Sequence, residues 1–306
     1  LSLPYGTEFK NNLFWTTDCS NGNVSIFNIR GEFIKYFGNQ GEKIGYLNNP
    51  ADIKVTNDKV YIVEENNNRV QIFSTDGYPL KTFGEFQEVK KENIKKNSDK
   101  FNNPLGLALG SDQILVVDYG NNRIMSYDEN FNNLWISSDI IWNGPYYAEY
   151  IKKRESFVVV NRGSNNIVLL NKFGKVTKIF GDKILNFPHE VAVDEIGNLL
   201  VANYSNNNVI IFDEKSDYDN YHEVKFPESY GLVKTVTSIN KNNFLVGFVT
   251  NGHSYFLHLR KNNDQLSFLQ NNDYTNFHIS INQFSQVGLN SSFNKYKNHC
   301  SSCHEK

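Results

Sequence analysis

The chain has 306 residues, of which 39% are hydrophobic and 14% are aromatic, and its formal net charge is −2 at pH 7. This length exceeds that of an ordinary single domain but is typical of one large all-β domain. The 31 Lys and Arg residues nearly balance the 33 Asp and Glu residues, which argues against nucleic acid as a partner because such proteins usually carry a basic excess. No apolar run is long enough to predict a membrane span.

A pattern of three short strands repeats six times along the chain. In residues 101–127, an alternating apolar strand follows Pro104, a second strand ends at Asp118, and a third follows an Asn-Asn turn. The units start at spacings of 46, 54, 41, 43 and 45 residues, at Pro4, Pro50, Pro104, Pro145, Pro188 and Val233. The second strands end at Asp18, Glu64, Asp118, Asn161, Asn203 and Phe248.

Each unit has room for a fourth strand after this pattern. The predicted fourth strands are residues 32–37, 79–83, 133–137, 175–180, 222–226 and 265–269. Repeats of roughly 40 to 50 residues with four strands each are typical of β-propeller blades, which bury their faces only by stacking around a central axis. We therefore predict an all-β fold, a six-bladed β-propeller that spans residues 1–285.

The repeated motifs resemble a known family. They are F-x-x-P before the first strand, N-N-R before the third strand, and a closing Phe-Gly at residues 37–38, 83–84 and 180–181. This pattern resembles the NHL repeat over about residues 3–260, best in the second, third and fifth units. The resemblance implies a six-bladed propeller but no single function, because NHL propellers serve as protein- and RNA-binding platforms and as lyases.

Period-two alternation in the first strand of each unit predicts which side chains face the central channel. Apolar residues such as Ile53 and Val55 pack between blades, so the intervening positions face the axis. These positions hold Glu8, Asp52, Lys54, Glu149, Glu190, Thr235 and Thr237. Carboxylate oxygens are the ligands that Ca²⁺ prefers, so one interpretation is a weak acidic cation site. The other is a set of hydrated groups in a water-filled channel.

His189 occupies the place where NHL-type peptide-amidating lyases, which these repeats resemble, carry Pro-His zinc ligands on several blades. The other units have Tyr5, Ala51, Leu105, Tyr146 and Lys234 at this position. A catalytic zinc needs about three protein ligands. We therefore expect His189 to be a wall residue of the channel and not part of a three-histidine zinc site.

Polar residues at the ends of the second strands have a structural interpretation. The Asn-Asn pairs at residues 67–68, 121–122, 165–166 and 206–207 are expected to serve turn geometry alone, because Asn tolerates the left-handed backbone of tight hairpins. The acidic or amide residues from Asp18 to Asn203 are expected to cap backbone groups between blades.

The character of the sequence changes after residue 285. Phe293, Tyr296 and Cys300 fall on one face of a predicted short helix that starts after residues 291–292. The chain then reads Cys300-Ser-Ser-Cys303-His304. C-x-x-C-H is the attachment motif of c-type haem, in which the two thiols bond the porphyrin and the histidine ligates iron. The alternatives are a chance occurrence of these five residues, a redox-active or disulfide-bonded cysteine pair, and a partial zinc site.

Residues 291–306 resemble the opening of a class I cytochrome c domain. The resemblance implies that residues 286–306 are the truncated start of a haem-binding module. The full-length protein is then expected to hold haem c covalently through Cys300 and Cys303, with His304 as the proximal iron ligand. Because thioether formation takes place in an extracytoplasmic maturation system, the motif predicts a periplasmic or otherwise extracytoplasmic location.

Two hypotheses of different class follow. The first is an extracytoplasmic propeller fused to a c-type haem module that acts in electron transfer. In one version of it the protein is a dehydrogenase, an oxidoreductase that passes electrons from a small-molecule substrate to the haem and on to a redox partner protein. The second is a non-enzymatic NHL propeller that serves as a protein- or glycan-binding platform.

Overall fold

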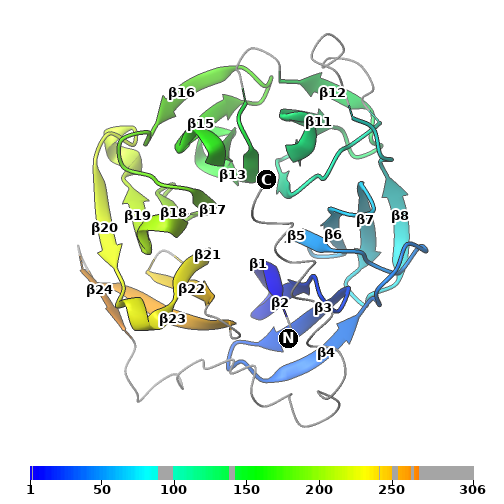
Figure 1. The fold of residues 1–306 in the computed structure, drawn as a ribbon, viewed down its shortest axis with the longest axis horizontal. Coiled ribbons are helices and arrows are strands. Elements are labelled where there is room, and N and C mark those ends of the chain that lie inside the picture. Colours follow the sequence, from blue (N-terminus) through cyan, green and yellow to red (C-terminus); the bar gives the residue numbers. More distant parts are fainter. Residues whose placement is uncertain are drawn as a thin grey trace.

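The computed structural model describes residues 1, 3–88, 99–137, 142–240, 242–249, 254–262 and 265–268. Within them, six antiparallel sheets of four strands form a ring around a central axis (Figure 1). Each sheet is one blade made of four consecutive strands, and its first strand lies next to the axis.

The strands of the six blades have the following bounds. Blade 1 contains β1 (Pro4–Lys10), β2 (Leu13–Asp18), β3 (Asn23–Asn28) and β4 (Phe33–Phe37). Blade 2 contains β5 (Pro50–Val55), β6 (Lys59–Glu64), β7 (Arg69–Ser74) and β8 (Pro79–Phe83). Blade 3 contains β9 (Gly106–Leu109), β10 (Ile114–Asp118), β11 (Arg123–Tyr127) and β12 (Asn133–Ile136). Blade 4 contains β13 (Pro145–Ile151), β14 (Ser156–Asn161), β15 (Asn166–Asn171) and β16 (Val176–Phe180). Blade 5 contains β17 (Pro188–Val193), β18 (Leu199–Asn203), β19 (Asn208–Phe212) and β20 (Tyr221–Lys225). Blade 6 contains β21 (Leu232–Asn240), β22 (Asn243–Val249), β23 (Ser254–Asn262) and β24 (Gln265–Phe268).

Helical structure in the described part of the chain consists of short 3-10 turns. They are η2 (Tyr119–Asn121), η3 (Lys152–Arg154), η4 (Arg162–Ser164), η5 (Tyr204–Asn206), η6 (Glu214–Ser216) and η7 (Glu228–Tyr230). No helix within the described residues is long and apolar enough to cross a membrane. The predicted helix near residue 293, the C-x-x-C-H motif and the expected boundary at residue 285 lie outside the described residues.

The predicted six-bladed propeller is confirmed. Five of the predicted second strands end at the expected residue, and β22 ends at Val249, one residue beyond Phe248. The predicted fourth strands agree with β4, β8, β12, β16, β20 and β24 within one residue at each end. The agreement is close because proline, glycine and asparagine mark the turns between strands of regular alternation.

The residue that ends the second strand caps the backbone of the connection into the same blade. In four blades, a side-chain oxygen of this residue accepts the N–H of the residue two positions before the proline that starts the repeat unit. These bonds join Asn48 to Glu64 (3.0 Å), Asn102 to Asp118 (2.7 Å), Asn143 to Asn161 (3.0 Å) and Asn186 to Asn203 (2.6 Å). In blade 1, the N–H of Leu3 donates to Asp18 Oδ1 (3.1 Å). The predicted capping role is therefore observed.

The Asn-rich turns do more than the sequence suggested. One Asn in each of four turns has a left-handed backbone: Asn68, Asn122, Asn165 and Asn207, with φ of 52°, 48°, 54° and 51°. The same four side chains also accept a backbone N–H from the following blade. Their donors are Asn103 (2.8 Å), Gly144 (2.8 Å), Phe187 (2.7 Å) and Val233 (3.1 Å). The expectation that these residues serve turn geometry alone was wrong, since each also ties its blade to the next.

The ring closes by side-chain packing between blades 6 and 1. Phe14 and Phe27 of blade 1 share a buried apolar cluster with Leu245 and Phe256 of blade 6. The Thr237 hydroxyl donates to the Thr7 carbonyl oxygen at 3.3 Å across the same junction. Within the described residues every blade is built from consecutive strands, so side-chain packing, and not a strand exchanged between blades, holds this closure there.

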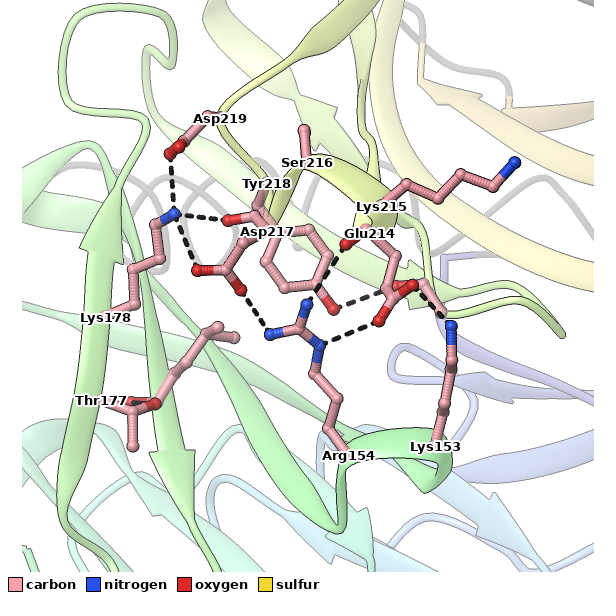
Figure 2. Close-up of polar contacts among 12 residues, drawn as sticks. Lys153, Arg154, Thr177, Lys178, Glu214, Lys215, Ser216, Asp217, Tyr218 and Asp219 are labelled. Atoms are coloured by element: carbon pink, nitrogen blue, oxygen red, sulfur yellow. Dashed lines mark hydrogen bonds and ion pairs between the residues drawn. The ribbon is translucent and has the colours of Figure 1, made fainter.

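A network of ion pairs fastens blade 4 to blade 5 (Figure 2). Arg154 of η3 lies 3.3 Å from Glu214 and 2.5 Å from Asp217, measured between guanidinium nitrogens and carboxylate oxygens. Lys178 of β16 lies 3.3 Å from Asp217 and 2.7 Å from Asp219. The guanidinium carbon of Arg154 also lies 4.6 Å from the centre of the Tyr218 ring. The network anchors the loop between β19 and β20 on the neighbouring blade.

Candidate functional site

The central channel contains two groups of side chains that lie at different depths. We call the group near the start of the innermost strands the mouth cluster; it consists of Tyr5, Tyr146, Arg162, Phe187, His189 and Lys234. We call the group farther along these strands the acidic cluster; it consists of Glu8, Asp52, Lys54, Tyr147, Glu149 and Glu190. Each cluster combines residues of blades that lie far apart in the sequence.

Lys54 lies at the centre of the acidic cluster. Its ammonium group donates hydrogen bonds to the Tyr147 hydroxyl at 2.7 Å and to Glu149 Oε2 at 2.9 Å. The same nitrogen lies 3.8 Å from Glu8 Oε2 and 3.8 Å from Asp52 Oδ1. The Lys54 side chain is 4% exposed. Three of the carboxylates predicted from alternation, Glu8, Asp52 and Glu149, therefore meet around one buried lysine.

Asp52 links the cluster to the backbone. Its Oδ1 accepts the N–H of Ile53 at 2.7 Å, and its Oδ2 accepts the N–H of Leu107 in blade 3 at 2.8 Å. Burial raises the pKa of Asp52 to about 6, while Lys54 and these two hydrogen bonds oppose that rise. Asp52 thus holds the innermost strands of blades 2 and 3 together.

The acidic cluster holds protons near neutral pH. Burial raises the pKa of Glu8 to about 8, with Lys54 opposing the rise. Burial, followed by the charge of Asp52, raises the pKa of Glu190 well above its ordinary value. Burial alone lowers the pKa of Lys54, but Asp52, Glu149 and Glu8 outweigh it and raise that pKa overall. The lysine therefore stays charged while part of the carboxyl groups stay protonated.

A cavity of about 180 Å³ lies beside the acidic cluster. Glu8, Tyr147, Glu149, Glu190 and Thr237 contribute to its wall. Among the described residues, no group of three or more His, Cys, Asp or Glu side chains is arranged to hold a metal ion. The ammonium of Lys54 itself supplies a positive charge between the carboxylates. Calcium binding in the channel stays a prediction.

Two tyrosines meet across the axis in the mouth cluster. Tyr5 of β1 and Tyr146 of β13 come from opposite blades of the ring (Figure 1), and their hydroxyl groups are hydrogen bonded to each other. Burial raises the pKa of both tyrosines. The two phenols therefore stay neutral near pH 7 and span the channel at this depth.

His189 lies among aromatic rings in this cluster. It is 3% exposed, and its ring centre lies 4.5 Å from that of Tyr146, 5.8 Å from that of Tyr5 and 5.6 Å from that of Tyr204. Within the described residues it belongs to no group that could hold a metal. This environment is that of a buried wall residue.

Two cations lie on the tyrosine rings. The guanidinium carbon of Arg162 lies 4.5 Å from the centre of the Tyr146 ring and 4.7 Å from that of Phe187. The ammonium of Lys234 lies 4.0 Å from the centre of the Tyr5 ring. Arg162 was not predicted as a site residue. The sequence did contain a signal for Arg162. Arg162 directly follows Asn161, the last residue of a second strand, and the residue after a second strand begins the turn at this end of the blade.

A ring of six four-stranded blades around a central channel defines the class of this protein: it is a β-propeller. Residues 47–73 and 101–125 match the NHL repeat. The chain is therefore a six-bladed β-propeller that carries NHL repeats in its second and third blades.

Known proteins share parts of this architecture. The chain is 26% identical to Protein brain tumor of Drosophila melanogaster over 144 residues, which are 44% of this chain and 13% of that protein. Its fold is similar to that of virginiamycin B lyase from Staphylococcus aureus, with a TM-score of 0.62, 13% identity, and coverage of 89% of this chain and 86% of that chain. It is also similar to Kuenenia stuttgartiensis hydrazine synthase, with a TM-score of 0.63, 13% identity, and coverage of 84% and 77%. At these identities the solved structures show the fold alone.

Proposed function

We propose that this chain is the propeller part of an extracytoplasmic c-type haem protein that works in electron transfer. The observation that carries the proposal is the sequence Cys300-Ser-Ser-Cys303-His304. Its two thiols and its histidine have the type and spacing that covalent haem attachment requires. The chain has three cysteines in all. Cys19 is buried in blade 1, where its thiol donates to the Leu3 carbonyl oxygen at 3.2 Å.

In this proposal Cys300 and Cys303 hold the porphyrin and His304 ligates the iron. The haem supplies one-electron chemistry when it is bound. In the dehydrogenase version of the proposal, the propeller binds the substrate. Oxidation of a substrate by a dehydrogenase releases a proton, and a nearby base with a pKa close to the working pH accepts it best. Glu8, whose pKa burial raises to about 8, has this property and lines a cavity of about 180 Å³.

The test uses the full-length natural protein, exported together with a c-type haem maturation system. We expect haem that stays with the polypeptide after denaturation, an absorbance spectrum of haem c, and a mass increase equal to one haem. Replacing Cys300 and Cys303 by alanine should abolish all three signals. The matched control Cys19→Ala should retain them. A wild-type protein without covalent haem under these conditions would refute the proposal.

The alternative, a non-enzymatic platform for a protein or glycan partner, is favoured by one feature of the surface. Large apolar side chains are exposed on β4 and β8, the outermost strands of blades 1 and 2, and directly before β8. They are Phe33, Ile34 and Tyr36 on β4, Leu80 on β8, and Tyr78 in the turn before β8. Tyr36 is 60% exposed and Tyr78 is 70% exposed. Exposed apolar patches commonly mark interaction surfaces. If the full-length protein binds no haem, and Tyr36→Lys with Tyr78→Lys abolishes a specific complex with an apolar partner, the alternative holds.

A further inference from the structure

Arg162 has a fixed position between two aromatic rings from neighbouring blades. Its backbone N–H donates to the Gly144 carbonyl oxygen at 3.1 Å. Tyr146 of blade 4 supplies one ring, and Phe187, directly before blade 5, supplies the other. Phe187 is held in turn, because its N–H donates to Asn165 Oδ1 at 2.7 Å. The contacts with these two blades therefore hold the guanidinium in place, in addition to the rotamer of its own side chain.

The charge of Arg162 is not matched by a carboxylate among the described residues. The four other arginines with described side chains each pair with one: Arg30 with Glu32, Arg69 with Glu64, Arg123 with Asp118, and Arg154 with Glu214 and Asp217. The guanidinium of Arg162 forms no such pair, and its Nε is buried without a hydrogen-bond acceptor. A buried donor of this kind is costly unless an acceptor reaches it.

The carboxylate of Glu65 is engaged by other side chains. Glu65, at the same end of the channel, accepts hydrogen bonds from the side-chain amides of Asn49 and Asn103. A second cation, Lys234, lies on the face of Tyr5, whose hydroxyl group bonds that of Tyr146. The mouth cluster therefore combines two cations, two phenol hydroxyls and aromatic walls.

We propose that the mouth cluster is an anion-binding site in which Arg162 binds the carboxylate or phosphate group of a small ligand. A guanidinium presents parallel N–H donors in a fixed fork, which matches both groups bidentately. The rings of Tyr146 and Phe187 leave the edge of the guanidinium for the anion and favour a ligand with a planar apolar body. The site is separate from the acidic cluster and does not depend on haem.

Titration calorimetry on the 306-residue chain tests the proposal with four probes: benzoate, phenyl phosphate, inorganic phosphate and benzylamine. We expect benzoate or phenyl phosphate to bind in the millimolar range or tighter. Arg162→Gln should weaken that binding by about tenfold or more, which is the value of one charge-assisted hydrogen bond. Arg162→Lys should restore only part of it, because an ammonium cannot bind bidentately. Whichever anion binds more tightly identifies the acidic group of the ligand.

Arg154→Gln serves as the matched control, because Arg154 is also an arginine near an aromatic ring but is paired with carboxylates outside the channel. It should bind both anions like the wild type. The proposal is overturned if neither anion binds the wild type, if Arg162→Gln binds as tightly as the wild type while its circular dichroism is unchanged, or if benzylamine binds equally well. Inorganic phosphate that binds as tightly as phenyl phosphate would overturn the role of the rings.

Discussion

The Oδ1 atom of Asn165 in blade 4 accepts a hydrogen bond of 2.7 Å from the backbone N–H of Phe187, at the entrance to blade 5. Asn165 has a φ of 54°, in the left-handed region, and this backbone turns its side chain toward the next blade. Asn68, Asn122 and Asn207 make the corresponding bonds at three other junctions. One residue type therefore serves both the turn within a blade and the contact between blades.

The two roles of Asn165 can be separated by mutation. Asn165→Gly keeps the left-handed backbone but removes the bond to Phe187, so the free energy of unfolding should fall by about 1 kcal/mol. Asn165→Ala removes the same bond and also forces alanine into the left-handed backbone conformation. The free energy of unfolding should therefore fall by about 1–2 kcal/mol more. Urea denaturation measures both values. Asn130→Ala, in an exposed turn, should leave stability unchanged. Equal stability of the glycine and wild-type proteins would show that the bond between blades contributes nothing.

The acidic cluster predicts how stability depends on pH. Burial raises the pKa of Glu8 from 4.5 to about 8 and that of Asp52 from 3.8 to about 6. The folded protein therefore binds these protons more tightly than the unfolded chain does. The resulting stabilisation is complete below the unfolded pKa values and is lost as the pH rises through about 6 for Asp52 and about 8 for Glu8.

We therefore expect the free energy of unfolding to contain a contribution from Glu8 that falls as the pH rises from 4.5 to about 8. Glu8→Gln keeps the shape of the side chain but cannot ionise, so its stability should fall less steeply over this range. Denaturation curves at a series of pH values provide the slopes. Glu129→Gln, at an exposed turn, should match the wild-type slope. Parallel curves for wild type and Glu8→Gln would contradict the prediction.

Arg123 and Asp118 form an ion pair at 2.7 Å in which both side chains are 0% exposed. Arg123 also donates to the Lys100 carbonyl oxygen at 2.7 Å. Removing one partner leaves a buried charge, so Arg123→Met should cost about 3–5 kcal/mol of unfolding free energy. The equivalent pair in blade 2 is Arg69 with Glu64, and the Arg69 side chain is 12% exposed. Arg69→Met should therefore cost less in the same denaturation assay. If Arg69→Met lowers the free energy of unfolding more than Arg123→Met does, burial does not determine which of the two ion pairs contributes more.

The network around Arg154 should be sensitive to salt. The Arg154 side chain is 28% exposed, so Arg154→Gln should cost about 1 kcal/mol or less at low ionic strength. The difference from wild type should shrink in about 1 M salt, where the screening length is about 3 Å. Thermal unfolding at two salt concentrations checks this. Arg30→Gln, which alters a pair with side chains 66% and 59% exposed, should have almost no effect. A loss that persists unchanged in high salt would point to packing on Tyr218 instead of charge.

The number of blades, the ends of the second strands and the bounds of the fourth strands could be predicted from the sequence. Alternation, proline at the start of innermost strands and asparagine in the turns act over a few residues, so they can be followed along the chain without knowledge of its path in space. The same alternation placed Glu8, Asp52, Glu149 and Glu190 toward the axis. The haem motif is likewise a local pattern and rests on the sequence alone.

Which of these side chains come into contact depends on the tertiary structure. Lys54 and Glu149 are 95 residues apart, and Tyr5 and Tyr146 are 141 residues apart, yet each pair is in contact. Local patterns carry no information on such contacts, because they depend on how closely the innermost strands approach the axis. For the same reason the sequence did not single out Arg162, whose two rings come from different blades. Stacking of six blades around one axis brings these distant residues together.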